Sequence, residues 1–418
     1  RIPLGKTIIE KIFSEHVGRD VHTNEEIMIE PDVICAYELP GYVDKFYAQL
    51  KELGIEKAKH PERVIIGLDH YYPGGTPEDQ EIHKITWEFV NHYGYHIIDG
   101  EGISHQVITE RFLKPGMIAV HHDAHACLFA ALGVTLFPLG GGLIEPLAME
   151  SLALICAPTV RINFHGKLRP GVAARDVQMY LLRTIGPSGA LNACLELGGN
   201  GLINLSMDDR MTICNQTMFV GAKTAVCEQD ENTAAYLKKF GIQWDKFYAP
   251  DPDAEYERVY DIDLSAITPM LLVPPIPSQT ASVQEYLGRP VQQGLVGSCA
   301  SGRMDDFRQV LEILRGRHVK REFRLVCVPS SIKIQEELCE SGMMAELIRC
   351  GARVHAPSCD FCYGKMAPLA SYETCLADAQ INVRGRLGSK KADIFTASPY
   401  TIAAAAVTGV ITDPTTLL

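Results

Sequence analysis

The chain has 418 residues, of which 46% are hydrophobic and 22% charged, and a formal net charge of −12 at pH 7. This length exceeds one ordinary hydrophobic core and predicts two or three globular domains. The acidic balance argues against nonspecific binding to nucleic acid or to anionic membranes, although a local basic pocket remains compatible with it.

The 13 cysteines are an odd number, and they lie scattered through apolar stretches such as residues 153–156 and 325–328. This pattern favours buried thiols in a reducing compartment over a disulfide framework. No segment reaches the roughly 18 apolar residues of a membrane helix, and the N-terminus has no signal-peptide pattern. We therefore expect the protein in the cytoplasm or an organelle matrix.

The first third of the chain predicts an α/β domain over residues 1–157. It combines predicted helices with short apolar strands, each strand followed by a polar loop. The helices are expected over residues 3–18 and 81–93, and the strands over 33–37, 63–68 and 117–120. The glycines at 140–142 fit no phosphate-binding motif and predict a turn or helix entry.

Three loops of this domain present histidines, and two of these histidines have an aspartate close by. The residues are Asp69, His70, His105, Asp123 and His125. Ligands usually bind at the carboxyl ends of parallel strands, and a carboxylate beside an imidazole orients it for proton exchange near neutral pH. A single such histidine is often only a structural hydrogen-bonding residue. Three at equivalent positions indicate a site.

A second α/β domain is predicted over residues 158–278, with a strand at 159–164, a helix at 175–185 and a connector from 245 to 278. Glu196 is the one acidic residue of an apolar strand. Because a buried glutamate is costly unless it is paired or liganded, Glu196 is a candidate site residue.

The third predicted domain, residues 279–418, contains the cysteines with the most distinctive spacing. One strand is expected to end at Cys299 and another just before Cys359, with Cys362 completing a C-x-x-C pair. Two strand ends of one sheet would then carry three thiolates. The chain closes with an alanine-rich helix predicted over 398–409.

Three thiolates leave several chemistries open. A structural zinc needs four ligands, and His355 is a possible fourth. A lone C-x-x-C is also compatible with a redox pair. An iron–sulfur cubane held by three thiolates leaves one iron open to bind water or substrate and act as a Lewis acid.

Arg384 and Arg386 lie two residues apart near the C-terminus. They are either paired forks that grip a carboxylate or part of a solvated basic strand.

Five motifs, in order and spacing, resemble the aconitase superfamily. They are residues 102–106, 123–125, 206–215, 297–303 and 359–364. The likeness is strongest to the large subunits of the isopropylmalate isomerase, homoaconitase and dimethylmalate dehydratase group, and it covers nearly the whole chain. It implies three α/β domains around a central cluster site, without the fourth, swivelling domain of the family.

The resemblance also implies functional residues. A [4Fe–4S] cluster would be held by Cys299, Cys359 and Cys362. The expected active-site residues are Asp69, His70, His105, Asp123, His125 and Glu196, with Asn215 in a supporting role. The expected substrate-binding residues are Arg303, Asn382, Arg384 and Arg386, of which Arg386 matches the arginine that contacts a substrate carboxylate.

The chain departs from the family pattern at several positions. Ala124 and Ser104 stand where the family usually has serine and cysteine, and Tyr37-Glu38 stands where it has His-Asp. Ile381 replaces an arginine, so one carboxylate contact is lost or has moved to Arg384. An apolar residue there favours a substrate unlike citrate.

These features predict a hydro-lyase that reversibly dehydrates a hydroxy di- or tricarboxylic acid, such as a 2-alkylmalate. A separate small subunit is expected to supply the swivelling domain. The alternative is a non-catalytic relative that senses its cluster or binds RNA, although the acidic charge disfavours nucleic acid.

Overall fold

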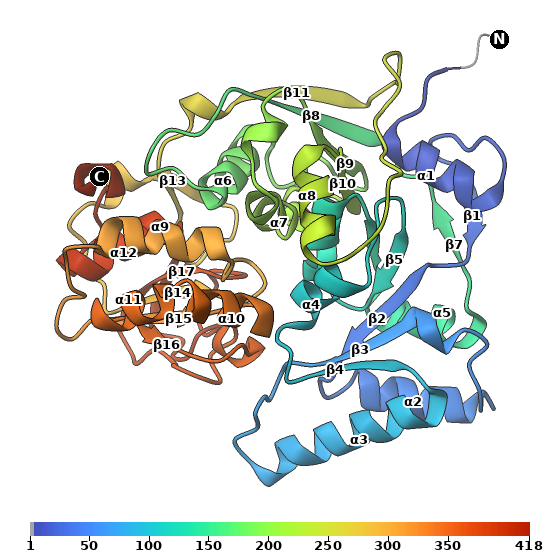
Figure 1. Cartoon of the computed structure of the whole chain (residues 1–418), viewed down its shortest axis with the longest axis horizontal. Helices are drawn as coiled ribbons and strands as arrows, with labels where there is room; N and C mark the ends of the chain where they lie inside the picture. Colours follow the sequence, from blue (N-terminus) through green and yellow to red (C-terminus); the bar gives the residue numbers. More distant parts are fainter. Residues whose placement is uncertain (1–3) are drawn as a thin grey trace. The chain divides into compact units, whose positions relative to one another are not determined.

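The computed structural model describes residues 4–418, which form two compact units (Figure 1). Unit 1 comprises the residues up to Asp99, Val107–His165 and Ser188–Ile262. Unit 2 comprises Gly100–Gln106, Gly166–Pro187 and Asp263–Leu418. The division into three domains at residues 157 and 278 stays a prediction.

The largest sheet of unit 1 has five strands in the order β4-β3-β2-β5-β6, and all neighbours are parallel. The strands are β2 (Val33–Tyr37), β3 (Val64–Leu68), β4 (His96–Asp99), β5 (Ile118–His121) and β6 (Thr135–Pro138). The chain runs outward from β2 to β4 and then returns to the other side of β2. Such a reversal opens a crevice at the carboxyl ends of the strands, where ligands of open α/β sheets bind.

Unit 1 contains six complete α-helices, and part of a seventh, within the described residues. They are α1 (Ile8–Val17), α2 (Val43–Glu52), α3 (Pro77–Tyr93), α5 (Ile144–Met149), α7 (Met207–Cys214) and α8 (Glu231–Lys239), while α4 (Ser104–Arg111) begins in unit 2. A capping box of Thr7 and Glu10 starts α1 at Ile8, so the predicted start at residue 3 was wrong. Helices α2 and α3 pack together beside the five-stranded sheet (Figure 1).

Two further sheets complete unit 1. The four-stranded sheet has the order β10-β9-β8-β11, and β10, β9 and β8 are parallel. The two-stranded sheet pairs β1 with β7 in antiparallel fashion. The bounds are β1 (Glu26–Ile29), β7 (Leu152–Ile155), β8 (Thr159–His165), β9 (Cys194–Gly198), β10 (Thr224–Cys227) and β11 (Arg258–Asp263).

Unit 2 is built on a seven-stranded sheet in the order β13-β12-β18-β17-β14-β15-β16. The five strands from β18 to β16 are parallel, and β12 runs antiparallel to β13 and β18. The bounds are β12 (Met270–Leu272), β13 (Thr280–Ser282), β14 (Gln293–Gly297), β15 (Arg324–Val328), β16 (Arg353–Val354), β17 (Thr374–Asp378) and β18 (Asp393–Thr396). The α/β class with parallel sheets is therefore confirmed.

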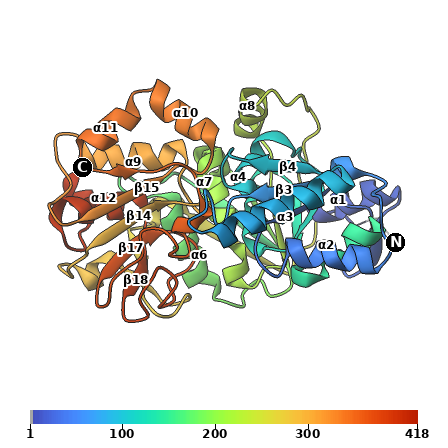
Figure 2. The same ribbon diagram turned by 90° about the horizontal axis from the view of Figure 1, so that it is seen from below.

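Both faces of this sheet are buried, as expected for parallel strands. Alternate residues, such as Val296 and Leu295 on β14, enter two different hydrophobic clusters. Helices α9 and α12 pack together over one face (Figure 2). The helices are α6 (Ala174–Ile185), α9 (Met304–Leu314), α10 (Ile332–Glu340), α11 (Met343–Arg349) and α12 (Pro399–Thr408).

Short 3₁₀ helices shape many of the connections. They are η1 (Pro61–Arg63), η2 (Ala124–Leu132), η3 (Gly140–Leu143), η4 (Leu202–Asn204), η5 (Thr217–Val220), η6 (Leu264–Ala266), η7 (Val283–Tyr286), η8 (Cys359–Phe361) and η9 (Pro414–Leu417). The predicted glycine turn is η3, which leads directly into α5.

Arg175 of α6 and Asp378 of β17 form a buried ion pair of 2.6 Å inside unit 2. The two residues come from different sequence segments of the unit, so the pair fixes one segment onto the other.

Two observations concern the setting of the chain. Within residues 4–418, no helix is both long enough and apolar enough to cross a membrane. All 13 cysteines lie in this range as free thiols, and only Cys339 is exposed.

Candidate active site

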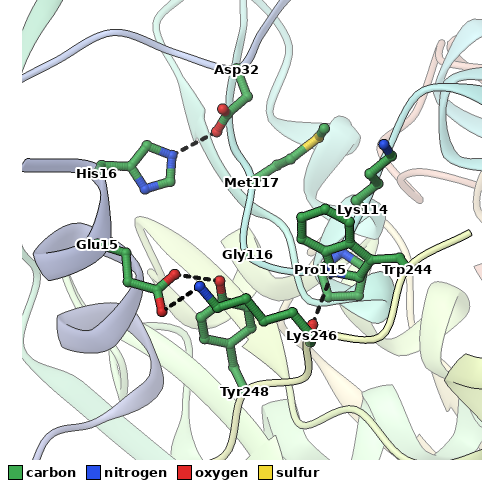
Figure 3. A pocket seen from close by; sticks show the side chains of 10 residues that line it. All are labelled: Glu15, His16, Asp32, Lys114, Pro115, Gly116, Met117, Trp244, Lys246 and Tyr248. Atoms are coloured by element: carbon green, nitrogen blue, oxygen red, sulfur yellow. Dashed lines mark hydrogen bonds and ion pairs between the residues drawn. The ribbon is translucent and has the colours of Figure 1, made fainter.

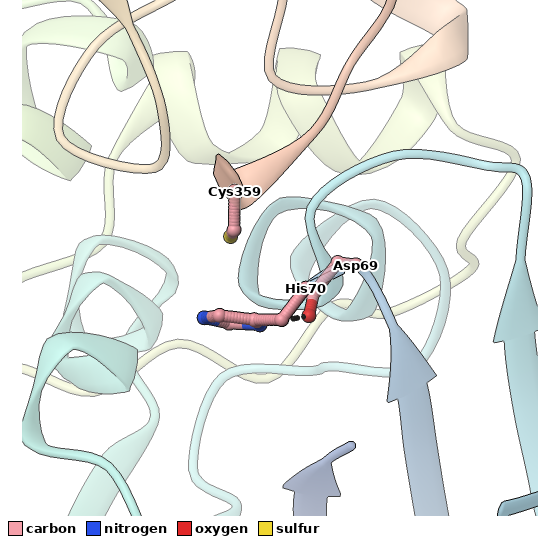
Figure 4. Close-up of side chains that lie close together, drawn as sticks. All are labelled: Asp69, His70 and Cys359. Atoms are coloured by element: carbon pink, nitrogen blue, oxygen red, sulfur yellow. Dashed lines mark hydrogen bonds and ion pairs between the residues drawn. The ribbon is translucent and has the colours of Figure 1, made fainter. Parts of the chain in front are cut away.

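Asp69 and His70 follow β3 and form a buried hydrogen-bonded pair (Figure 4). The ring nitrogen Nδ1 of His70 lies 2.6 Å from Asp69 Oδ1, and the residues are 8% and 2% exposed. A carboxylate at Nδ1 orients the imidazole and directs proton exchange with a ligand to Nε2. Cys359, also drawn in Figure 4, belongs to unit 2.

Glu38, directly after β2, holds the backbone of this pair with its side chain. Its carboxyl group accepts hydrogen bonds from the N–H groups of Asp69 and His70. Burial raises the pKa of Glu38 well above its ordinary value, and the neighbouring Asp69 carboxylate raises it further. A protonated Glu38 would add no second negative charge beside Asp69.

Asp123 and His125 follow β5 and form the second acid–imidazole pair. Asp123 Oδ1 accepts the backbone N–H of His125 at 3.0 Å and lies 3.1 Å from Nδ1 of its ring. The Tyr37 hydroxyl donates to Asp123 Oδ2 at 2.7 Å. Asn215, just after α7, donates to the His125 carbonyl oxygen at 2.9 Å. The loop is thus held from both sides.

Aromatic rings surround these pairs. The Tyr37 ring stacks on the His70 ring at 4.1 Å and meets the His122 ring edge-on at 4.3 Å. The Tyr42 ring stacks on the His122 ring, also at 4.3 Å. The carboxyl ends of β2, β3 and β5 therefore carry one cluster of rings and acids, at the crevice that the strand order predicts.

Glu196 lies on β9 in a buried network of its own. Its Oε2 accepts from Arg161 Nη1 at 2.9 Å and from the Tyr256 hydroxyl at 2.6 Å, and its Oε1 accepts from the Ile8 N–H at 2.8 Å. The second terminal nitrogen of Arg161 donates to Glu228 at 2.6 Å. The expectation that a buried glutamate must be paired is confirmed, whereas its catalytic role stays a prediction.

Cys299 lies in the loop after β14, and the backbone of this loop packs closely against the backbone at the end of β15. A Cβ on Gly302, whose φ is 74°, would lie 2.5 Å from the Val328 carbonyl oxygen. Arg303 is fully buried and donates to the Cys299 carbonyl oxygen through both terminal nitrogens, at 3.0 and 3.1 Å. The loop therefore has one tightly held conformation.

Cys359 and Cys362 bracket η8, and Phe361 between them packs into a hydrophobic cluster of the unit 2 sheet. The two cysteines and Cys299 are 4–5% exposed. The Gln380 side-chain amide donates to Cys299 Sγ. Such a donor stabilises a thiolate ligand.

If Cys299, Cys359 and Cys362 bound one zinc ion, their sulfur atoms would have to lie close together. Sulfurs bound tetrahedrally to one zinc lie about 3.8 Å apart, given Zn–S bonds near 2.3 Å. Among residues 4–418, no group of three ligand atoms within 4.8 Å of one another contains two of these cysteines or His355. Cluster binding by these three cysteines stays a prediction.

The remaining candidates of unit 2 make contacts of their own. Arg384 Nε donates to Asp393 at 2.9 Å and is half exposed, while Arg386 Nε donates to the Cys362 carbonyl oxygen at 3.0 Å. Asn382 is buried and donates to the Ile276 carbonyl oxygen. His105 is buried in the first turn of α4. Their roles toward a substrate stay predictions.

A hollow of about 370 Å³ on unit 1, lined by α1 and residues 114–117 and 244–248, is a separate feature (Figure 3). Four of its lining side chains form pairs: Glu15 with Lys246 at 2.8 Å, and His16 with Asp32 at 2.7 Å. Lys114, a further charged residue of the lining, lies over the Trp244 ring at 5.3 Å.

Unit 1 thus presents acid–histidine pairs at adjacent strand ends, and unit 2 presents three buried thiols in strand-end loops. This combination defines an α/β protein with candidate residues for proton transfer and for metal binding. A sequence model of the aconitase family, described as aconitate hydratase, matches residues 75–409. The chain belongs to the aconitase family.

Curated relatives match the chain along almost its whole length. The "3-isopropylmalate dehydratase large subunit 1" of Methanopyrus kandleri is 34% identical over 98% of this chain and 99% of its own. The "Homoaconitase large subunit" of Thermus thermophilus is 34% identical over 98% of both chains. Among solved structures, the holo form of aconitase X from Thermococcus kodakaraensis covers 89% of each chain at 13% identity, with a TM-score of 0.48.

Proposed function

We propose that this chain is the large catalytic subunit of an iron–sulfur hydro-lyase that reversibly dehydrates a hydroxy di- or tricarboxylic acid, such as a 2-alkylmalate. The observation that carries the proposal is the presence of two Asp–His pairs at neighbouring strand ends of one sheet. The full-length similarity to dehydratase and homoaconitase large subunits supports the reaction class.

Cys299, Cys359 and Cys362 would hold a [4Fe–4S] cluster. When bound through three thiolates, such a cluster supplies an open iron that acts as a Lewis acid toward substrate oxygen. Gln380 would lower the charge density on the Cys299 sulfur, and Arg303 would keep the loop in the shape that presents it. All three thiols are buried, which limits the access of solvent and oxidants to their sulfur atoms.

Proton transfer to the leaving group falls to the two Asp–His pairs of unit 1. Dehydration removes a proton from one carbon, which we assign to a base on the proposed small subunit, and hydroxide, a poor leaving group, from the neighbouring carbon. A proton from Nε2 of His70 or His125 would convert that hydroxide to water. Asp69 and Asp123 orient the rings and stabilise their protonated forms. In the reverse reaction, the same nitrogen takes the proton back.

Binding of the substrate carboxylates would fall to arginines of unit 2. Arg386 uses Nε for the Cys362 carbonyl, so its terminal nitrogens are the part of the guanidinium suited to grip a carboxylate. Arg384 is engaged by Asp393, and a substrate would have to compete for it. Ile381 offers an apolar side chain, which favours a substrate with an alkyl group.

The relatives' names support a second polypeptide, because each is called a large subunit. We propose a separate small subunit carrying the swivelling domain. The free thiols support a reducing compartment, and we place the reaction in the cytoplasm or an organelle matrix.

The test is anaerobic reconstitution of the chain together with its small subunit, followed by metal analysis and assay on a panel of 2- and 3-hydroxy diacids. We expect about four irons and four sulfides per chain and a brown chromophore. Serine variants of Cys299, Cys359 and Cys362 should lose both, whereas Cys339→Ser, at an exposed site on α10, should keep them.

His70→Asn and His125→Asn should keep the chromophore and lose about 100-fold or more in kcat. His165→Asn, at an exposed pair with Asp261, is the matched control. One zinc per chain, or a full cluster without activity on any hydroxy acid, would contradict the proposal.

A further inference from the structure

Tyr37 ends β2 between the two strands that carry the acid–histidine pairs. On one side, Tyr37 pairs with Gly67 of β3. On the other side, Cys35 pairs with His121 of β5, and Tyr37 lies two residues beyond Cys35. Equal steps along parallel neighbours stay abreast, so Tyr37 comes level with Asp123, two residues on from His121, while Asp69 lies two residues beyond Gly67. The sheet itself therefore brings Tyr37 close to both pairs.

The hydroxyl of Tyr37 engages the second pair. It donates to Asp123 Oδ2 at 2.7 Å, while Oδ1 of the same carboxylate serves the backbone and ring of His125 at 3.0 and 3.1 Å. The two carboxylate oxygens are thereby divided between two partners. Loss of the hydroxyl would remove one of the contacts that orient the Asp123 carboxylate toward His125.

The ring of Tyr37 engages the first pair. It stacks on the His70 imidazole with centroids 4.1 Å apart and an interplanar angle of 24°, while Asp69 holds the ring edge at Nδ1. An aromatic contact of this kind stabilises a ring orientation beyond what simple burial does. The stacking of Tyr37 on the ring face and the hydrogen bond of Asp69 at the ring edge together hold the His70 ring in one orientation.

We propose that Tyr37 is a positioning residue shared by the two pairs, with its hydroxyl fixing Asp123 for His125 and its ring fixing the plane of His70. Its consequence for catalysis rests on the proposed function, whereas its effect on the two histidines does not. Tyr37 is one of the positions at which the chain departs from the aconitase pattern.

Two substitutions separate the two roles. Tyr37→Phe removes the hydroxyl and keeps the stacked ring, and Tyr37→Leu removes both. Tyr42→Phe is the matched control, because it removes a hydroxyl from a neighbouring ring that stacks on His122. Thermal unfolding of each variant establishes that it is folded.

The readout is the NMR spectrum of the purified chain with ¹³C,¹⁵N-labelled histidine, with His70 and His125 assigned from their asparagine variants. Tyr37→Phe should shift or broaden the His125 ring signals and leave those of His70 in place. Tyr37→Leu should also move His70, because the ring current of the stacked tyrosine is lost. Tyr42→Phe should change neither.

Unchanged His125 signals in Tyr37→Phe, or unchanged His70 signals in folded Tyr37→Leu, would overturn the inference. In the reconstituted two-subunit enzyme, Tyr37→Phe should lower kcat about 10-fold with little change in KM, and parental kcat would overturn the catalytic part. If the parental enzyme dehydrates no hydroxy acid, the proposed function fails, while the NMR result still decides the role of Tyr37.

Discussion

Arg303 and Cys299 are joined by a fork of two hydrogen bonds, from both terminal guanidinium nitrogens to one carbonyl oxygen. The arginine is fully buried, and its Nη1 also reaches Gln106 at 3.2 Å. Its observed contacts hold the loop of a proposed cluster ligand, whereas the sequence alone assigns it to substrate binding.

Arg303→Lys tests which role dominates. Lysine keeps the charge but loses the planar fork, leaving buried carbonyl groups poorly paired, so the free energy of unfolding should fall by about 2 kcal/mol or more. Urea denaturation of the apo chain measures this. Arg308→Lys on the exposed face of α9 should stay within about 0.5 kcal/mol of the parent. A stable Arg303→Lys with a raised KM would instead support the substrate role.

Gln380→Leu should make the cluster more labile. The leucine has a similar volume but no amide to donate to the Cys299 sulfur, and loss of such an outer contact typically costs 10- to 100-fold in metal affinity or activity. The measurement is the rate at which the visible chromophore bleaches in air. Gln284→Leu, at an exposed site that pairs with Asp413, should bleach at the parental rate. Equal rates in both variants would refute a role for Gln380.

Glu196→Gln should destabilise unit 1. Burial raises the pKa of Glu196, while Tyr256 and Arg161 act against that rise. Removing its charge leaves Arg161 with one carboxylate, and breaking a buried pair costs about 3 kcal/mol. Glu228→Gln, which alters the more exposed partner, should cost less. If Glu196→Gln keeps parental stability and loses activity, the catalytic assignment from sequence gains support.

His16 and Asp32 should make stability depend on pH. Burial lowers the pKa of the His16 imidazole, but the hydrogen bond and charge of Asp32 outweigh it, so the pKa lies above the ordinary 6.5. A raised folded-state pKa contributes stability that is fully present below the unfolded pKa and is lost as pH rises through the folded one. The parent is expected to be more stable than His16→Gln in urea unfolding, and this difference should shrink as the pH rises above the ordinary pKa of 6.5. A constant difference would contradict the pairing.

The sequence predicted the strand-end pairs because parallel α/β sheets leave a readable pattern. Apolar runs ending at Asp69-His70 and before Asp123 placed these residues at one edge of one sheet, and the structure puts them there. The order β4-β3-β2-β5-β6 was not predictable from local patterns, because strand order depends on long-range packing.

Other contacts lay beyond sequence reasoning for the same reason. In the sequence, Tyr37 stands out only as a departure from a family pattern, although it is the last residue of a strand, whereas Asp69 is the first residue after one. Gln380 carries no local signal at all, since its partner Cys299 is 81 residues away. The cost of a buried glutamate correctly required a partner for Glu196, but could not name Arg161.

The ion pair of Arg175 with Asp378 bears on how the chain folds as it is synthesised. The arginine emerges early and its carboxylate about two hundred residues later, because unit 2 takes segments from within the sequence of unit 1. Residues 100–106 and 166–187 must wait for the last strands before their places in unit 2 exist. A nascent chain released before β17 would hold Arg175 without its counter-ion, so we expect truncated products to be targets for chaperones and proteases.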